Sequence, residues 1–458
     1  MKIEELIEEC CNETYEYAIL NHYKEFRSKV ISINSKNIKT IAVSCEKMYD
    51  GGIEKVVANI CCIWNEMGYR VILYTSEKAN SQDYYYPEDI KRIVVPSDKN
   101  ISGRLAVMAK SFQEEEVDIY INNNWASESL IWEVIMVKLL NIPIVLYVHG
   151  NYSHMYLYES QRHYRHQFYR PFQLCELVLC LDYESEVFYG LLGCRVKRID
   201  NPVPIDLLKN ATDYVPYDEM KGTHKVLWIG RLVDGKRILD AIAIINKVKE
   251  RFPDVTLEVV GDGPDLRRAK QIVKKEKLNE IVSFHGFQMN VDVFYKGCSL
   301  MLMTSEKEGF CFTLLESKAY GLPCVMYSLP YLPLTRNTQG ILEAPIGDIE
   351  SMARHIIDLF ENREKYEKLS MQARDDYERY CSIDIKNIWR NIFDDKLERN
   401  MNVDFKYYCK VIENILDEEE KSFNVYVAKS KDIVIGKIIL YLPRKLLNLI
   451  LKFRSKTL

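Results

Sequence analysis

The chain has 458 residues, of which 47% are hydrophobic and 28% charged, and its formal net charge is −4. This length fits two or three domains, and the composition is that of a globular protein. The slightly acidic balance gives no support to nucleic-acid binding, and no stretch reaches the roughly 20 apolar residues of a membrane span.

The N-terminal run Met1-Lys-Ile-Glu-Glu is acidic where a secretory signal would be basic and then apolar, so we expect no signal peptide. Thirteen cysteines are scattered without a C-x-x-C pair or the spacing of a metal site. The adjacent pairs Cys10-Cys11 and Cys61-Cys62 cannot easily bridge within themselves. We interpret them as reduced core residues of a cytoplasmic protein.

Residues 1–37 predict a polar helical extension. After it, apolar strands alternate with helical segments, which is typical of a parallel sheet covered on both faces. The expected strands of this first half are 40–45, 70–75, 93–95, 117–122, 143–149, 177–181 and 196–199, and its clearest helices are 53–67 and 127–140.

A polar stretch over residues 200–223 predicts an interdomain linker, and a second alternation follows it. Its expected strands are 226–229, 256–260, 281–285, 299–303, 323–327 and 341–343, and its expected helices are 238–251, 266–277, 313–320 and 349–360. The sequence therefore predicts an α/β protein with two Rossmann-like domains, 38–205 and 206–385, which bind ligands at the carboxyl ends of their strands. A helical segment over 386–430 that returns toward the first domain and a basic amphipathic tail over 431–458 complete the expected organisation.

Glu308 and Glu316 stand eight residues apart, the first in the loop after strand 299–303 and the second inside the following helix. A helix N-terminus after a strand is an anion site, because unpaired N–H groups and the helix dipole point at the ligand. Carboxylates beside that site would repel a phosphate and are better suited to accepting hydrogen bonds from hydroxyls. A ligand with both kinds of group is a sugar joined to a nucleotide diphosphate.

Three further features follow strands of this alternation. Gly51-Gly52 precedes the first helix of the first half, where glycines let backbone approach a diphosphate closely, although a plain turn is the alternative. Arg231 and Lys236 follow the first strand of the second half and can neutralise a departing diphosphate, unless they form only a solvated basic loop. The run from Gly261 to Asp265 opens a helix with Asp265 as a candidate N-cap.

His149 ends the fifth expected strand, where a lone histidine is more often structural than functional. His154, His163 and His166 lie nearby, but no carboxylate or cysteine completes a metal-ligand set, and the chain has no Asp-x-Asp pair. We therefore expect no metal and no cofactor, with the diphosphate charge met by Arg, Lys and helix dipoles. Singly these features are weak, but in order and at successive strand ends they indicate one ligand site.

Over roughly residues 38–400 the chain closely resembles the retaining GT-B glycosyltransferases of family 4, which include enzymes of bacterial capsule, teichoic-acid and lipopolysaccharide assembly. The most specific part is Gly230-Arg-Leu with Lys236, followed by the Glu-x7-Glu stretch and Gly321-Leu-Pro323. The resemblance implies that Arg231 and Lys236 contact the donor diphosphate. It also implies that Glu308 touches donor-sugar hydroxyls and that Glu316 binds the ribose hydroxyls.

The same resemblance implies that His149 sits near the reacting sugar and that Gly51-Gly52 reaches the diphosphate from across a cleft. The residues whose backbone amides are implied to approach the sugar and phosphates are Gly309, Phe310, Cys311 and Phe312. Asn201-Pro-Val203 resembles the segment that enters the linker, with Pro202 in place of the commoner glycine. Cys311 stands where many members have Gly or Pro, which puts the identity of the donor sugar in doubt.

The expected function is retaining transfer of a hexose-type sugar, from a donor that is a UDP-sugar on family grounds, to a glycan or lipid-linked acceptor. Residues 152–171 are expected to face that acceptor. The alternatives are a nucleotide-sugar epimerase and a catalytically silent paralogue that stabilises a partner transferase.

The tail over residues 431–458 holds seven Lys and Arg against one acid, with apolar residues at near-helical intervals. Such a segment can lie in an anionic membrane surface, which would place the protein at the inner face of the cell membrane. The alternative is that this face packs on the protein or on a partner.

Overall fold

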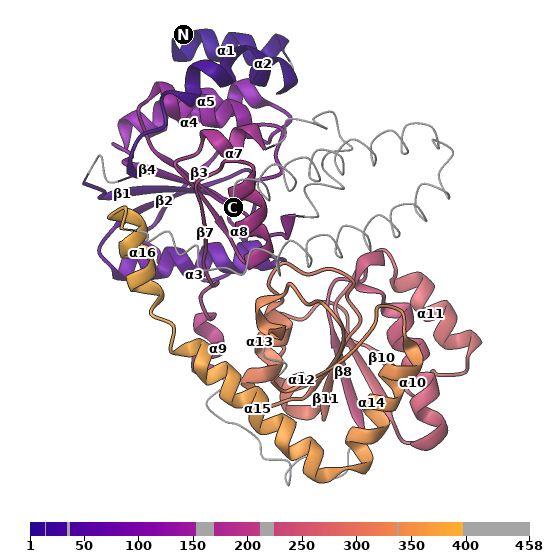
Figure 1. Ribbon diagram of the computed structural model, residues 1–458. Helices are drawn as coiled ribbons and strands as arrows, with labels where there is room; N and C mark the ends of the chain where they lie inside the picture. The colour runs from indigo at the N-terminus through magenta and orange to yellow at the C-terminus, as the bar shows by residue number, and fades with distance from the viewer. Residues whose placement is uncertain (14, 34–36, 153–168, 211–223, 337–338, 397–458) are drawn as a thin grey trace, which may run out of the picture. The chain divides into compact units, whose positions relative to one another are not determined.

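The computed structural model describes residues 1–396 apart from 14, 34–36, 153–168, 211–223 and 337–338. The chain divides into two compact units (Figure 1): unit 1 is Met1–Pro202 with the chain from Asp384 on, and unit 2 is Val203–Ile383. The sequence placed these divisions after residues 205 and 385. None of the helices in the described part of the chain is both long and apolar enough to cross a membrane.

Unit 1 is built on a parallel seven-stranded sheet in the order β3-β2-β1-β4-β5-β6-β7. Its strands are β1 (Thr40–Ser44), β2 (Arg70–Thr75), β3 (Lys91–Val94), β4 (Ile119–Asn122), β5 (Ile144–Tyr147), β6 (Leu177–Cys180) and β7 (Val196–Arg198). In the central strands Ile41 pairs with Val71 on one side and with Ile119 on the other. All residues of β1, β4, β5 and β6 are buried, which explains why these strands are continuously apolar instead of alternating.

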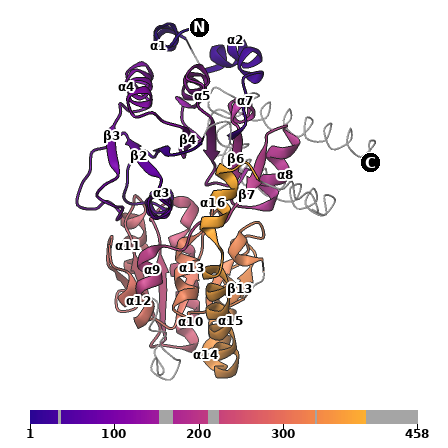
Figure 2. The ribbon, with the colours of Figure 1, turned by 90° about the vertical axis from the view of Figure 1, so that its left-hand side faces the viewer.

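Helices cover both faces of this sheet. They are α1 (Ile3–Asn12), α2 (Tyr15–Arg27), α3 (Gly52–Glu66), α4 (Ile101–Glu114), α5 (Leu130–Leu139), α7 (Arg170–Leu174), α8 (Tyr183–Leu191) and α16 (Ile385–Phe393). Figure 1 shows α4 and α5 on one face and α3 with α16 on the other. Figure 2 shows α1 and α2 as an outer layer over α4 and α5, and Leu6 and Phe26 are fully buried there. The N-terminal extension is therefore helical, as expected, but it is part of the core of unit 1.

Unit 2 repeats this design with a parallel six-stranded sheet in the order β10-β9-β8-β11-β12-β13. Its strands are β8 (Lys225–Ile229), β9 (Thr256–Val260), β10 (Val282–Phe284), β11 (Leu300–Met303), β12 (Cys324–Tyr327) and β13 (Ile341–Ala344). Its helices are α9 (Ile205–Asn210), α10 (Ile238–Arg251), α11 (Leu266–Lys275), α12 (Asp292–Gly297), α13 (Phe312–Ala319), α14 (Ile349–Glu361) and α15 (Arg363–Cys381). Figure 1 shows α12 and α13 on the side of the sheet away from α10 and α14.

The chain reverses direction once in each sheet, between β1 and β4 in unit 1 and between β8 and β11 in unit 2. At such a switch point neighbouring loops leave the carboxyl edge in opposite directions, and ligands of doubly wound sheets bind there. The loops that follow β8 and β11 carry Arg231, Lys236 and Glu308. The topology therefore accounts for the convergence of Lys236 and Glu308, which lie 72 positions apart in the sequence.

Candidate active site

Two loops of unit 2 are tied together at the carboxyl edge of the sheet. Thr304, just after β11, places its buried Oγ1 2.9 Å from the carbonyl oxygen of Lys236, in the loop that follows β8. The same hydroxyl accepts a hydrogen bond of 3.0 Å from the Trp228 indole, and the Glu306 amide donates to the Gly235 carbonyl at 3.0 Å. These hydrogen bonds fix the backbone of the two loops that carry the charged side chains of the site.

Lys236 forms an ion pair with Glu308 across these two loops. The Lys236 side chain is 27% exposed and that of Glu308 is 11% exposed. Partial burial disfavours the charged ammonium, but the Glu308 carboxylate outweighs it and raises the pKa of Lys236 above its ordinary value. The charge of the Arg231 guanidinium acts in the opposite direction on that pKa, and Arg231 lies in the same loop as Lys236, after β8. Arg231 itself is exposed.

The N-terminus of α13 follows Glu308 directly, as the sequence predicts. Cys311 is its N-cap, with φ 70° and ψ 75°, in the left-handed region that favours glycine. Burial raises the pKa of the Cys311 thiol to about 12, so it is a neutral group at the start of the helix. The Phe310 ring packs against those of Phe312 and Tyr380, at 5.0 and 5.6 Å between centroids.

Glu316 lies within α13, as expected, and is 7% exposed. Its Oε2 accepts a hydrogen bond of 2.8 Å from the hydroxyl of buried Tyr295. Tyr295 therefore positions Glu316. The backbone amide of Glu308 donates to the Tyr331 hydroxyl at 3.1 Å, which holds the other carboxylate of the pair in place.

The loop after β9 packs against the loop after β8 through two glycines. A Cβ on Gly261 would lie 2.0 Å from the Gly230 carbonyl oxygen, and one on Gly263 would lie 2.4 Å from that of Leu232. Both residues also have positive φ, 131° and 155°. Asp265 occupies the N-cap position of α11, but its side chain makes no capping hydrogen bond, because its backbone is already helical. These glycines therefore serve close backbone packing beside Arg231.

In unit 1, His149 follows β5 by two residues and is 7% exposed. Asn123 donates from Nδ2 to the Ser44 carbonyl at 3.0 Å, which leaves its Oδ1 to accept from His149 Nε2 at 2.8 Å. The imidazole thus carries its proton on Nε2, and its Nδ1 has no hydrogen-bond partner among the described residues. Burial lowers the pKa of His149 to about 3, so the ring is neutral. A neutral Nδ1 is a hydrogen-bond acceptor, but the atom is buried, so a ligand hydroxyl reaches it only if neighbouring side chains move.

Gly51 and Gly52 lie at the N-terminus of α3, with Gly51 as N-cap in extended backbone and Gly52 as the first helical residue. The Glu54 carboxyl covers this turn, since a Cβ on Gly51 would lie 2.0 Å from Glu54 Oε2. Burial raises the pKa of Glu54. The helix end that the sequence assigns to a diphosphate therefore lies beside a carboxyl group of the same helix.

The structure thus brings Arg231, Lys236, Glu308 and the first turn of α13 together in unit 2, and places His149 and Gly51-Gly52 at the carboxyl edge of unit 1. His154, His163 and His166, most of the expected acceptor region 152–171, and the tail over 431–458 lie outside the described residues. Within the described residues no group of three or more His, Cys, Asp or Glu is arranged to hold a metal ion. Cys11 is exposed, which corrects its assignment to the core.

Sequence reasoning missed Thr304, Tyr295, Tyr331 and Asn123, each of which holds a site residue or loop in place. Thr304 could have been suspected, since it lies only four residues before Glu308. Tyr295 and Asn123 gave no signal, because their role depends on contacts 21 and 26 residues away along the chain.

Comparisons with known proteins identify the family of the chain. The family profile for Glycosyltransferase Family 4 matches residues 50–205, and that for Glycosyl transferases group 1 matches residues 215–376. The chain is 32% identical over 170 residues to the N-acetyl-alpha-D-glucosaminyl L-malate synthase of Bacillus anthracis, an alignment that covers 36% of this chain and 44% of the relative. It is 25% identical over 236 residues to the poly(glycerol-phosphate) alpha-glucosyltransferase of Bacillus subtilis (strain 168), covering 51% and 34%. These alignments span less than half the length of either relative.

Solved structures share the fold. Anabaena Alr3699/HepE in complex with UDP and glucose matches with a TM-score of 0.62 at 17% identity, covering 78% of this chain and 100% of that one. The lipopolysaccharide outer core galactosyltransferase WaaB matches with a TM-score of 0.59 at 18% identity, with coverages of 78% and 100%. The expected GT-B fold is confirmed.

Proposed function

We propose that this chain, which belongs to glycosyltransferase family 4 and has the GT-B fold, transfers a sugar from a nucleotide diphosphate sugar to an acceptor hydroxyl. The observation that carries the proposal is the cluster of Arg231, Lys236 and Glu308 at the first turn of α13. It combines two cations and a helix N-terminus, which suit a diphosphate, with a carboxylate, which suits sugar hydroxyls.

In this reaction the bond between the anomeric carbon and the diphosphate breaks, and the diphosphate leaves with the electron pair. Arg231, Lys236 and the α13 amides stabilise the negative charge that develops on it. Because Glu308 already holds the Lys236 ammonium in place, little reorganisation is needed as that charge appears, and removing one such group typically lowers the rate by about 10²–10³. Glu308 and Glu316 bind sugar and ribose hydroxyls, and His149 lies near the transferred sugar.

We further propose that the donor is a UDP-hexose, that no metal takes part and that the anomeric configuration is retained. The acceptor oxygen then attacks on the face that the diphosphate leaves, and a phosphate oxygen takes the acceptor proton. UDP is supported by the solved relative that holds UDP-glucose. Metal-independent transfer is supported by two cations beside a helix N-terminus, which can meet the diphosphate charge.

We propose a glycan or lipid-linked acceptor. One relative is named for glucosyl transfer to poly(glycerol-phosphate), which is an acceptor of this broad class. A lipid-linked acceptor would give the basic residues 431–458 a purpose at an anionic membrane surface, at the inner face of the cell membrane. Sedimentation with phosphatidylglycerol vesicles, with and without residues 431–458, tests this part, and equal pelleting would contradict it.

A panel of UDP-, GDP- and ADP-sugars tests the proposed activity. We expect slow release of free nucleotide from one donor in the absence of acceptor, and its loss in Lys236→Ala. Interconversion of sugars without nucleotide release would instead identify an epimerase. Neither reaction, with intact binding of a partner transferase, would identify a silent paralogue.

A further inference from the structure

The helix α11 is strongly basic on its exposed side. Its ten residues contain five cations and no acid, in a chain whose net charge is −4. Ala269 and Val273 are buried against the core of unit 2, and the charged side chains lie in solvent. The exposed polar residues of the helix are Arg267, Arg268, Lys270, Gln271, Lys274 and Lys275.

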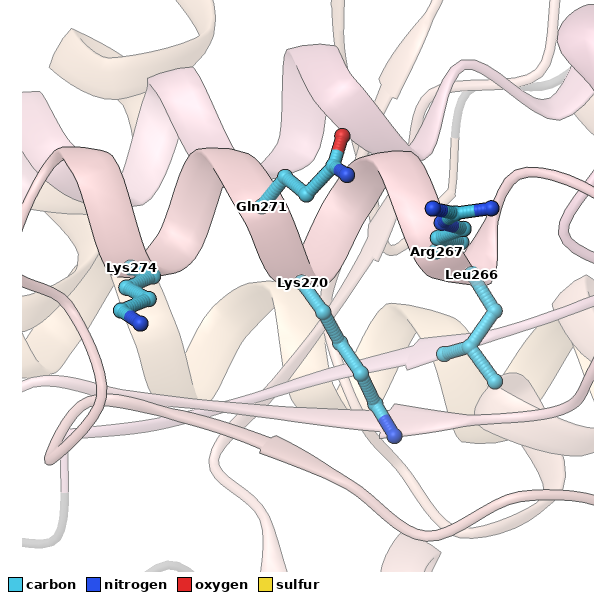
Figure 3. A pocket seen from close by; sticks show the side chains of 5 residues that line it. All are labelled: Leu266, Arg267, Lys270, Gln271 and Lys274. Carbon is cyan, nitrogen blue, oxygen red and sulfur yellow. The ribbon is translucent and has the colours of Figure 1, made fainter.

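Three of these cations surround a shallow hollow of about 450 Å³. We call Arg267, Lys270 and Lys274 the α11 basic face; Leu266 and Gln271 complete the lining of the hollow. Figure 3 shows the five side chains leaving one helix, with Lys270 extended away from it. Seven positions separate the first and last of these cations, which corresponds to about 10 Å along the helix. The array is therefore linear.

The cations of the α11 basic face make no ion pair with the residues that the structure describes, whereas comparable cations elsewhere in unit 2 do. Lys247 pairs with Glu350 at 2.6 Å and Arg251 with Glu361 at 2.5 Å. Lys270 lies over the Phe284 ring, with 5.8 Å between its Nζ and the ring centroid. No carboxylate among the described residues offsets the three charges, and like charges held within one helix repel each other, so an anionic partner is favourable there.

We propose that the α11 basic face binds a linear polyanion, specifically a glycan or polyol chain that carries phosphodiester groups. A bilayer fits less well, because the apolar side chains of α11 face the core and Leu266 is the single apolar residue of the hollow. A single-stranded nucleic acid fits less well, because none of the five lining residues is aromatic and could stack on a base.

The position of α11 connects this face to the candidate active site. The Leu232 amide donates to the Asp262 carbonyl at 2.9 Å, and the Asp265 amide donates to the Leu232 carbonyl at 3.0 Å, just before α11 begins. The helix therefore starts one loop away from Arg231. A polymer bound along the helix would have one end at the carboxyl edge of the sheet. The identification of the bound polymer as the acceptor rests on the proposed function, whereas the binding of the polymer to the α11 basic face does not.

Binding of poly(glycerol phosphate) to the full-length protein, followed by calorimetry, tests the proposal. The variant replaces the basic face by glutamine, Arg267→Gln/Lys270→Gln/Lys274→Gln. The matched control, Lys247→Gln/Arg251→Gln/Arg363→Gln, removes the same charge from three ion-paired residues of unit 2. We expect the basic-face variant to bind at least about tenfold more weakly and the control to bind like wild type. Affinity for wild type falls as salt rises.

Equal binding by the basic-face variant, or equal weakening in the control, would overturn the proposal. So would loss of phosphatidylglycerol-vesicle pelleting in the variant with unchanged polymer binding, which would assign the face to a membrane. Tighter binding of single-stranded RNA than of the polymer would assign it to nucleic acid. Nucleotide release from the donor without acceptor is expected to be unchanged in the variant. Its absence in wild type would contradict the proposed function without touching the binding result.

Discussion

The Lys236–Glu308 pair combines two opposing requirements in one contact. A cation that must stabilise a departing diphosphate has to be charged, yet partial burial disfavours its charge. Glu308 resolves this by raising the pKa of Lys236, so the ammonium stays protonated throughout the neutral range. The stability that this pairing contributes is present below the ordinary lysine pKa and is lost only as the pH rises through the raised value.

Glu308→Gln is expected to keep the fold and to lower kcat/KM for sugar transfer by about 10²–10³, because Lys236 loses its charged partner and the donor loses a hydroxyl ligand. Steady-state kinetics together with a thermal melt checks both halves. Glu306→Gln is the matched control, since Glu306 lies in the same loop and its carboxylate is 3.4 Å from Arg237. Wild-type turnover in Glu308→Gln, or an equal loss in Glu306→Gln, contradicts the assignment.

His149 makes unit 1 sensitive to acid. Its pKa is about 3 in the folded chain and roughly 6.5 when unfolded, so between these values the unfolded state binds more protons. Stability therefore falls as the pH drops below about 6.5, by about 3 kcal/mol from this group at pH 4.5. We expect His149→Gln to flatten the dependence of the urea midpoint on pH, measured between pH 7 and 4.5. His285→Gln is the control, because His285 is only partly buried and lies in unit 2. It is expected to leave the pH dependence of the urea midpoint as in wild type. If His149→Gln instead gave a pH dependence parallel to that of wild type, the prediction would be wrong.

Which residues of the site could be predicted depends on whether their role is local. The sequence indicates four charged residues of the site, because charge at a strand end is unusual and the spacing of these residues matches the strand–loop–helix pattern. They are Glu308, Glu316, Arg231 and Lys236. The role of Glu54 could not be predicted, because a glutamate in a first helical turn normally interacts with solvent and the dipole. Only the folded structure shows that the carboxyl group of Glu54 lies over Gly51.

At the scale of elements, the strands were the most predictable feature. Buried parallel strands are short apolar runs, and β2 and β9 begin and end where the sequence indicated. The linker was less predictable, since the helix α9 lies within the stretch predicted only as an interdomain linker. The packing of α1 and α2 into unit 1 could not be inferred from their polar composition, because it rests on a few buried side chains such as Leu6 and Phe26.

The close approach of the loops after β8 and β9 depends on Gly261. Gly261→Ala introduces a Cβ 2.0 Å from a backbone oxygen at a φ of 131°, so one loop has to move. We expect a loss of about 1–3 kcal/mol from backbone strain alone, and a lower kcat because Arg231 shifts with its loop. Denaturant unfolding and kinetics measure these effects. Gly297→Ala is the control, because a Cβ on this helical glycine would meet nothing within 4 Å beyond its chain neighbours and its own helix backbone, and the change should be neutral or slightly stabilising. Equal behaviour of the two variants contradicts this role.

At the scale of the whole molecule, the chain passes from unit 1 to unit 2 and back again. It leaves unit 1 after Pro202 and returns to it at Asp384, so α16 completes a unit whose other elements lie nearly two hundred residues earlier. Trp389 is fully buried and packs edge-on against Trp64 of α3, with 4.8 Å between ring centroids. Lys386 pairs with Glu66 of the same helix at 2.9 Å. The C-terminal segment is therefore a structural part of unit 1.

Trp389→Ala is expected to destabilise unit 1 by about 3–5 kcal/mol, because it removes a fully buried indole between α3 and the sheet. Hydrogen exchange followed by mass spectrometry separates the two units: protection should fall in α3 and β5 and stay unchanged in α10 and β9. Met371→Ala, at a 63% exposed position on α15 of unit 2, controls for removal of a large apolar side chain outside unit 1. If protection instead fell equally in both units, α16 would stabilise the whole chain and the division at Asp384 would not be an energetic one. Trp389 also lies 6.3 Å from the Tyr147 ring of β5, whose centroid is 4.2 Å from that of His149. A selective loss in unit 1 therefore means that truncation before α16 removes this packing beneath His149 while the cluster around Lys236 stays folded.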